Sequence, residues 1–154
     1  MSRLKKMQPI LDIAERKEQD AAKRLGLGQQ KLDKARTNLE NLVTYRNGYA
    51  ARFEASGQEG LSVQQLTEYR AFLQKINKVI ADQERTVSQA ETDLTRLRAG
   101  WEDAHRHVLG MRKVVGKLHN EEIAKEQKRE QLEQDDRIGS RRDNGGKSLL
   151  TLFL

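Results

Sequence analysis

Apolar residues recur along the chain at alternating intervals of three and four positions. From Leu66 to Leu118 this spacing defines 16 positions, and all of them except Gln83 are apolar or aromatic. Such spacing is typical of the buried seam of a coiled coil. A stripe this narrow needs a second helix to cover it. The pattern therefore predicts a long helix over residues 62–137 that packs against another helix.

The first third of the chain carries a matching seam. From Leu4 to Phe53 the same spacing defines 15 positions, of which 12 are apolar and Glu18, Gly28 and Arg46 are the exceptions. A glycine weakens a helix by about 1 kcal/mol relative to alanine. Gly26 and Gly28 therefore permit either a close approach of the facing helix or a bend. We expect this first helix to span residues 4–55.

A short polar stretch separates the two seams. Residues 56–61 include Gly57 and Gly60, and glycine readily ends a helix. Ser62 with Gln65 three positions later matches a capping box. Because a short link makes two helices antiparallel neighbours, the fold class is all-α. The prediction is a long two-helix antiparallel coiled-coil hairpin with unequal arms, forming one domain over residues 1–138 with its tip at 56–61.

The two arms differ in length. At 1.5 Å per residue, the first spans roughly 78 Å and the second roughly 114 Å. Counting back from the tip places Leu4 near residue 113, so we expect the charged segment from Val114 to Arg137 to extend past the first arm as a frayed end or a docking element. After Ile138 the chain becomes rich in glycine, serine and arginine. This composition predicts a flexible tail over residues 139–154.

Composition agrees with a rod of long helices. Charged residues make up 34% of the 154, and aromatic residues 5%, which is thin for a globular core. The one proline, Pro9, lies near the start, and there is no cysteine for a disulfide or a thiolate site. No apolar run is long enough to span a membrane. The net charge of +6 is interspersed without a clustered basic stripe, so we expect no nucleic-acid partner.

Catalytic and metal-binding motifs are absent from the sequence. His105, His107 and His119 lack the i,i+4 spacing of helical metal ligands. Gly26-Leu27-Gly28 and Gly145-Gly146-Lys147-Ser148 lack the other glycines and the strand of a phosphate-binding loop. General acid–base catalysis needs a concave pocket, which a two-helix hairpin does not offer. We expect no enzyme activity, no metal and no cofactor.

Aromatic residues gather near the predicted tip, with Tyr45 and Tyr49 on the first arm and Tyr69 and Phe72 on the second. Phe72 and Val79 lie outside the seam and should be partly exposed. Exposed apolar groups in one region indicate a partner site. The alternative is that they shield the flank of the seam, and the sequence favours neither.

A second group of interest is basic. Between residues 105 and 119 the chain carries Arg106, Arg112, Lys113 and Lys117 without any acidic residue. These side chains either meet an acidic partner surface or form a solvated helix face.

The order of several motifs resembles a known family. These motifs are Leu11-Asp12-Ile13-Ala14-Glu15, Ala21-Ala22, Leu25-Gly26, Leu39 and Leu42 before Tyr45-Arg46 and Tyr49, Tyr69-Arg70-Ala71-Phe72-Leu73, Gln83, Trp101, Lys128-Arg129-Glu130-Gln131 and Asp135-Asp136. In this order around a hairpin tip they are similar to the FliJ family of the bacterial flagellar type III export apparatus. The resemblance covers about residues 4–137, and the apolar end from Leu149 to Leu154 departs from the family pattern.

This resemblance implies a coupling or escort role in flagellum biogenesis, flagellar protein export, motility and chemotaxis. The implied partners are the export ATPase ring, which the hairpin would enter like the central stalk of a rotary ATPase, the cytoplasmic domain of the export gate protein, and export chaperones. The implied location is cytoplasmic, peripherally associated with the inner membrane at the flagellar base.

The resemblance also assigns two surfaces. The gate-facing residues would be Leu42, Tyr45, Tyr49, Phe72 and Ile76. The ATPase-facing residues would be Leu11, Glu15, Ala21, Leu25 and Arg129. An alternative function that needs no resemblance is a coiled-coil scaffold or chaperone that shields a client helix along its uncovered length.

Overall fold

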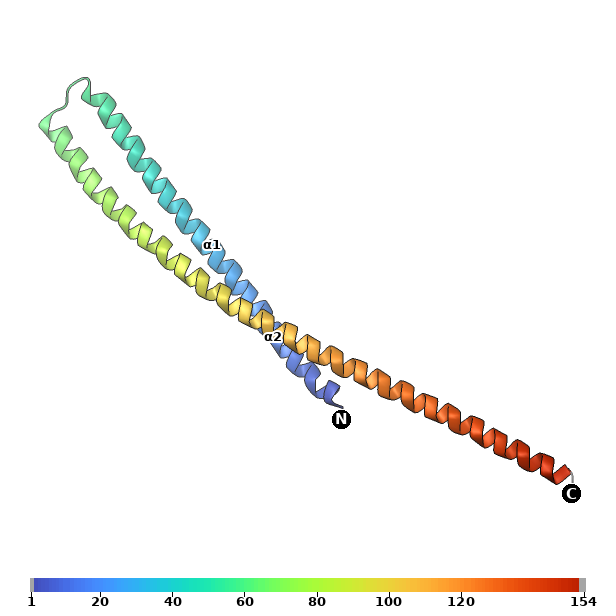
Figure 1. Cartoon of the computed structure of the whole chain (residues 1–154). Helices are drawn as coiled ribbons and strands as arrows, with labels where there is room; N and C mark the ends of the chain where they lie inside the picture. The colour runs from blue at the N-terminus through green and yellow to red at the C-terminus, as the bar shows by residue number, and fades with distance from the viewer. Residues whose placement is uncertain (1, 153–154) are drawn as a thin grey trace. The chain divides into compact units, whose positions relative to one another are not determined.

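Two long helices make up the fold. The computed structural model describes residues 2–152, and the side chains of residues 2–141. Helix α1 spans Arg3–Gly57 and helix α2 spans Val63–Leu152 (Figure 1). The two pack against each other as an antiparallel hairpin with arms of 55 and 90 residues. The predicted all-α hairpin with unequal arms is confirmed.

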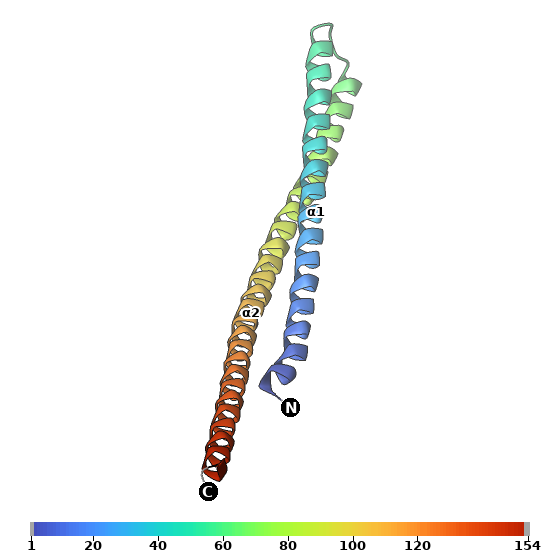
Figure 2. The same cartoon turned by 90° about the vertical axis from the view of Figure 1, so that its right-hand side faces the viewer.

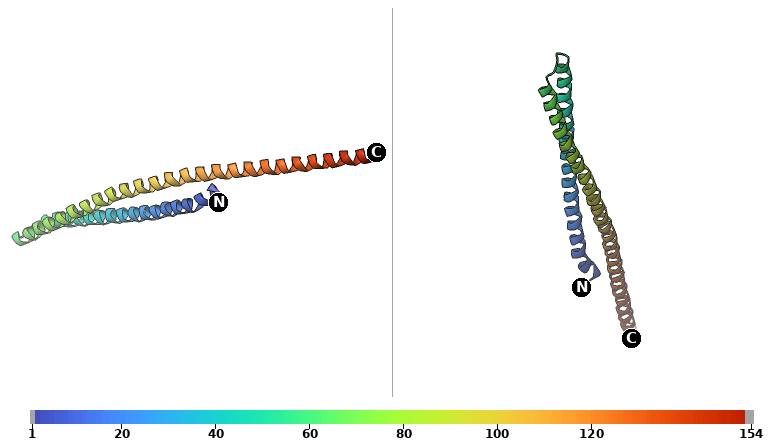
Figure 3. Two further views of the ribbon diagram at one scale, coloured as in Figure 1. Left: turned by 90° about the horizontal axis from the view of Figure 1, so that it is seen from below. Right: turned by 90° about the vertical axis from the view of Figure 1, so that its left-hand side faces the viewer.

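The hairpin divides into two compact units, which are described separately. Unit 2 is Arg16–Arg106, and unit 1 consists of the described residues up to Glu15 and from His107 onward. In unit 2, α1 and α2 run side by side in opposite directions from the link that joins them (Figures 1 and 2). In unit 1, the first turns of α1 lie along the part of α2 that follows His107 (Figure 3).

The seam predicted from the spacing is the buried stripe of both helices. Every seam position is buried or half-buried except Leu66, which is 37% exposed near the link. In unit 2 the best-covered cluster joins Leu32 of α1 to Ala90 and Leu94 of α2. Burial of these apolar side chains removes them from water and stabilises the pair of helices.

Of the two glycines in the middle of α1, Gly28 faces α2 closely and Gly26 does not. A Cβ built on Gly28 would lie 2.6 Å from Cδ1 of Leu97, whereas one built on Gly26 meets nothing within 4 Å. Gly28 occupies a seam position, so its missing side chain lets Leu97 of α2 approach the α1 backbone. Of the two alternatives left by the sequence, close approach therefore applies to Gly28.

Two polar seam residues bond across the interface in unit 2. Gln83 Nε2 donates to the backbone carbonyl of Ala35 at 3.0 Å. Arg46 donates through NH1 to Oδ1 of Asn77 at 3.0 Å. Because these bonds need particular residues to face each other, they help to fix the register of α1 against α2.

Glu18, the third polar residue in the seam, lacks part of its hydrogen bonding. Oε1 of Glu18 lies 3.5 Å from Nδ1 of His105, and the His105 ring stacks on Trp101 with centroids 4.9 Å apart. Oε2 of Glu18 and Nδ1 of His105 are buried without a hydrogen-bond partner among the described residues. A buried polar atom without a partner costs stability, so this layer is a weak point of the unit 2 seam.

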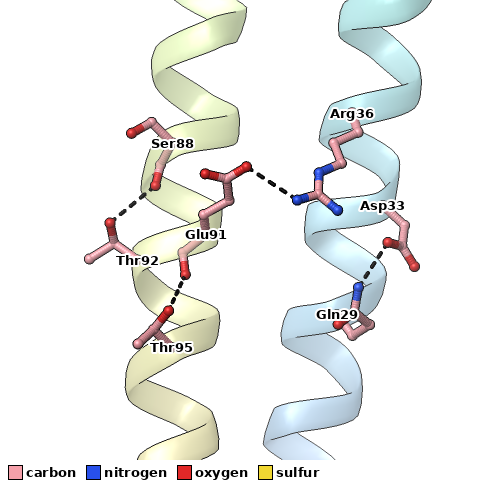
Figure 4. A network of polar contacts seen from close by, with 7 residues as sticks. All are labelled: Gln29, Asp33, Arg36, Ser88, Glu91, Thr92 and Thr95. Atoms are coloured by element: carbon pink, nitrogen blue, oxygen red, sulfur yellow. Dashed lines mark hydrogen bonds and ion pairs between the residues drawn. The ribbon is translucent and has the colours of Figure 1, made fainter.

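Ion pairs flank the seam. Arg36 of α1 and Glu91 of α2 meet at 3.2 Å between NH2 and Oε1, beside the Gln29–Asp33 hydrogen bond (Figure 4). In unit 1, Arg112 and Glu15 meet at 3.3 Å between Nε and Oε1. Both pairs are solvent-accessible, so each contributes at most about 1 kcal/mol, and their main effect is on register.

The link between the helices follows the turn chemistry of the sequence. Gly60 has a φ of 92°, which glycine adopts without strain. The Ser62 hydroxyl accepts from the Gln65 N–H at 3.1 Å, and the Gln65 side chain accepts from the Ser62 N–H at 2.9 Å. The predicted capping box at the start of α2 is confirmed.

Two boundaries differ from the sequence-based expectations. In unit 1, Val115 and Leu118 are half-buried and Arg3 lines a hollow with Leu118, so the uncovered part of α2 begins after about residue 122 and not at Val114. The expected position was too early because it assumed equal counting from both sides of the link.

The second boundary is the helix end. Helix α2 continues to Leu152 without stopping near Arg137. No proline follows Pro9, so nothing in the sequence compels an earlier end. The flexible tail over 139–154 stays a prediction, and residues 153–154 lie outside the described residues. Within the described residues, neither helix contains a stretch apolar and long enough to cross a membrane.

Candidate partner-binding surfaces

Five aromatic side chains form a continuous stack in unit 2 close to the link. We call them the aromatic cluster: Tyr45, Tyr49 and Phe53 of α1 with Tyr69 and Phe72 of α2. Phe53 stacks on Tyr69 with centroids 3.7 Å apart, and Tyr49 stacks on Phe72 at 4.0 Å. Tyr45 meets the Phe72 ring edge-on at 5.7 Å. Each aromatic pair is worth about 0.5–1.5 kcal/mol beyond the burial of its area.

The cluster has a buried side and an open side. Tyr49, Phe53, Tyr69 and Phe72 are half-buried, whereas Tyr45 is 54% exposed. The guanidinium of Arg52 lies 6.0 Å from the centre of the Tyr49 ring, within cation–π range. The cluster therefore shields the flank of the seam and also presents rigid aromatic surface, and the partner site stays a prediction.

The structure brings three of the five expected gate-facing residues into one contact group. Tyr45 and Tyr49 each pack on Phe72 in the aromatic cluster. Leu42 is half-buried and Ile76 is 8% exposed, and both lie in the seam. Sequence reasoning left Phe53 out of this group, although its seam position directly after Tyr45 and Tyr49 at four-residue spacing was the available signal.

The five expected ATPase-facing residues do not form one exposed group. Leu11 is 6% exposed in the seam, and Ala21 and Leu25 are half-buried seam residues. Glu15 is half-buried and paired with Arg112, whereas Arg129 is exposed on the uncovered part of α2. Leu11, Glu15 and Arg129 belong to unit 1, and Ala21 and Leu25 to unit 2.

Exposed aliphatic residues adjoin the buried ones in unit 1. Ile10 is 47% exposed and Ile13 is 53% exposed, next to Leu11 and Ala14 in the seam. They offer a partner more accessible apolar surface than Leu11 does.

The uncovered part of α2 is a charged single helix. From residue 123 to residue 141 every side chain is exposed, and no other helix lies beside this length within the described residues (Figure 3). Ile123, Leu132 and Ile138 are 41–58% exposed. A helix without tertiary contacts depends on weak i,i+4 pairs, so this length has little stability of its own, and a frayed end and a docking element both stay predictions. Within the described residues no three His, Asp or Glu side chains gather closely enough to hold a metal ion.

Comparison with known proteins identifies the family. The model of the family described as "Flagellar FliJ protein" matches residues 3–145. This chain belongs to the FliJ family. The resemblance found in the sequence is therefore confirmed.

A FliJ relative matches over a shorter stretch. The flagellar FliJ protein of Escherichia coli strain K12 is 26% identical over 80 residues, which are 52% of this chain and 54% of that protein. The chain thus spans about half the length of the curated FliJ protein that it matches. No solved structure matches the chain.

Proposed function

We propose that this chain is the coupling component of the flagellar export apparatus. It would bind the export ATPase ring in the manner of a central stalk, through the end of the hairpin that carries the chain termini. It would also contact the cytoplasmic domain of the export gate protein, associate with export chaperones, and stay peripheral to the inner membrane. The observation that carries the proposal is the family match over residues 3–145.

The hairpin geometry supports a stalk role. A pair of packed helices is narrow enough to enter a ring, and the uncovered part of α2 adds a charged helical end around Arg129. Ion pairs on such an end are weak and solvent-exposed, so they permit contact with successive subunits without locking onto one of them. The seam residues Leu11, Ala21 and Leu25 would act by holding the two helices together.

The aromatic cluster supports a gate contact. Rigid aromatic side chains with an exposed edge are enriched at binding hot spots, and Tyr45 presents the most accessible edge of the cluster. Because Tyr45 packs on Phe72, a partner that binds one ring gains from the rigidity of the other.

The gate contact is tested by truncating these rings. We expect Tyr45→Ala with Phe72→Ala to weaken binding to the cytoplasmic domain of the gate protein at least tenfold, because hot-spot aromatics cost 2 kcal/mol or more, roughly, when removed. Isothermal titration calorimetry measures the affinity, and circular dichroism checks that helicity is retained. Leu27→Ala, which removes a 65% exposed side chain of α1 that lies outside the candidate surfaces, is the control. Wild-type affinity in the double variant would remove the gate assignment from these residues.

A scaffold or chaperone function is the second candidate, favoured by the uncovered length of α2. A client helix packing there would cover Ile123, Leu132 and Ile138. In the free chain, amides of 123–138 should exchange hydrogen faster than those of 76–108, because no second helix covers them. An export chaperone or substrate should slow exchange at 123–138 and leave 76–108 unchanged. A client that binds without slowing exchange over 123–138 would exclude this candidate.

A further inference from the structure

One flank of unit 1 combines exposed aliphatic side chains with cations. On α1, Arg3, Lys6, Ile10 and Ile13 follow one another at intervals of three, four and three residues. These intervals place them on one face of the helix. Ile10 and Ile13 are 47% and 53% exposed, so about half of each side chain faces solvent.

Helix α2 completes the same flank. A shallow hollow is lined by Val114 and Leu118 of α2 and by Arg3, Lys6 and Met7 of α1. These residues of the two helices therefore lie next to each other. Val114 is 45% exposed, and Lys117 follows it by three residues on the same face. We call Arg3, Lys6, Ile10, Ile13, Val114 and Lys117 the apolar–basic patch.

The charge of this region is one-sided. Residues 3–15 and 107–118 carry six lysine and arginine residues against two acidic ones, Asp12 and Glu15. Asp12 accepts a hydrogen bond from Gln8, and Glu15 pairs with Arg112 on the other flank. No side chain of Arg3, Lys6 or Lys117 forms an ion pair or hydrogen bond with the side chains described. The patch therefore presents uncompensated positive charge around aliphatic groups.

We propose that the apolar–basic patch binds the surface of an anionic lipid bilayer. Aliphatic side chains interleaved with lysine and arginine on one helix face are the pattern of interfacial membrane binding. The cations would bind lipid phosphates while Ile10, Ile13 and Val114 enter the headgroup–acyl boundary. This flank lacks an aromatic anchor and a deep pocket, the features that mark a protein-binding hot spot.

The inference deepens the proposed function, since it supplies a physical basis for peripheral association with the inner membrane. The patch lies beside Leu11 in the same unit, so a lipid-bound chain and an ATPase-bound chain would compete for this part of unit 1. A vesicle assay contains neither the ATPase nor the gate protein. A lack of vesicle binding therefore counts against the lipid site alone. A lack of ATPase or gate binding does not count against the lipid site.

The test is co-sedimentation of the full chain with vesicles. Vesicles of phosphatidylcholine with about 30% phosphatidylglycerol are compared with phosphatidylcholine alone, at low and high salt. We expect sedimentation with the anionic vesicles only, and less of it at high salt because salt screens the charges. Equal binding to neutral vesicles, or no binding at low salt, would overturn the proposal.

Variants then locate the site. Lys6→Gln with Lys117→Gln should lower the partition coefficient about 25-fold, at about fivefold per cation. Lys75→Gln with Lys78→Gln removes the same charge from exposed positions of unit 2 and is the matched control. Equal loss in both pairs would mean attraction by net charge alone and would overturn the assignment to the patch.

The aliphatic contribution has its own control. Ile10→Asn with Ile13→Asn should weaken binding about tenfold at unchanged net charge. Leu109→Asn, at a 49% exposed position one residue after the buried Val108, should leave binding unchanged. Circular dichroism checks that each variant is folded. If the double isoleucine variant is unfolded, the two double lysine variants, which change exposed side chains, still test where the lipid site lies. Loss of binding in Leu109→Asn equal to that in the isoleucine pair would contradict the proposed location.

Discussion

At the scale of single residues, two neighbouring glycines in α1 have opposite surroundings. Gly26 faces open space, whereas a Cβ on Gly28 would meet Cδ1 of Leu97 at 2.6 Å. Alanine at either site gains about 1 kcal/mol of helix propensity. At position 28 that gain is offset, because Leu97 is half-buried in the seam and must shift to make room.

This contrast gives a prediction about stability. Gly26→Ala should raise the free energy of unfolding by about 1 kcal/mol. The free energy of unfolding of Gly28→Ala should be about 1–3 kcal/mol lower than that of Gly26→Ala. Thermal and urea unfolding followed by circular dichroism measures both variants against the parent chain. Equal stabilisation by the two substitutions would mean that Leu97 does not pack against the α1 backbone.

The sequence identified the seam residue by residue but not the partners of its polar members. Regular three- and four-residue spacing marks which side chains face inward, whatever lies opposite. Gln83, Arg46 and Glu18 were visible as exceptions, yet their partners Ala35, Asn77 and His105 depend on the register between the helices. Register is set by the length and geometry of the link, which the spacing does not encode.

At the scale of the helix, the start of α2 rests on the reciprocal bonds of Ser62 and Gln65. We expect Ser62→Ala to lower the free energy of unfolding by about 1 kcal/mol, because the Gln65 N–H loses its acceptor. Ser88→Ala, the same substitution at an exposed position inside α2, should be neutral or slightly stabilising. Urea unfolding of both variants provides the measurement, and equal effects would argue against a stabilising cap.

Helix boundaries were harder to predict than helix identity. The capping box fixed the start of α2, since its two residues lie close in sequence. The end had no such signal, because the glycines after Ile138 weaken a helix without forbidding it, and α2 continues to Leu152. The start of the uncovered length, after about residue 122, depends on how far α1 reaches along α2, which is again a question of register.

The residues of the candidate partner surfaces were also predicted only in part from the sequence. Tyr45, Tyr49 and Phe72 could be grouped from the sequence, because a hairpin brings its arms together near the link. Phe53 was read only as a seam residue, although its ring stacks on Tyr69 at 3.7 Å. Conversely, Leu11, Ala21 and Leu25 were expected at a partner surface, and the structure places them in the seam.

At the scale of the whole molecule, function depends on what the hairpin does to larger partners. The proposed coupling function requires the hairpin to bind the export ATPase, so it predicts an effect on the activity or assembly of that ATPase. Binding that favours the ring shifts the equilibrium between subunits and rings by mass action. Turnover and ring number should therefore rise together.

The most direct measurement is ATP hydrolysis by the matching flagellar export ATPase, with and without this chain, combined with electron-microscope counts of ATPase rings. The coupling function predicts faster hydrolysis and more rings when the chain is present. It also predicts a smaller effect for Arg129→Glu, which changes an exposed side chain on the uncovered part of α2. Unchanged hydrolysis and unchanged ring numbers at saturating concentrations of the chain would contradict a stalk-like coupling function.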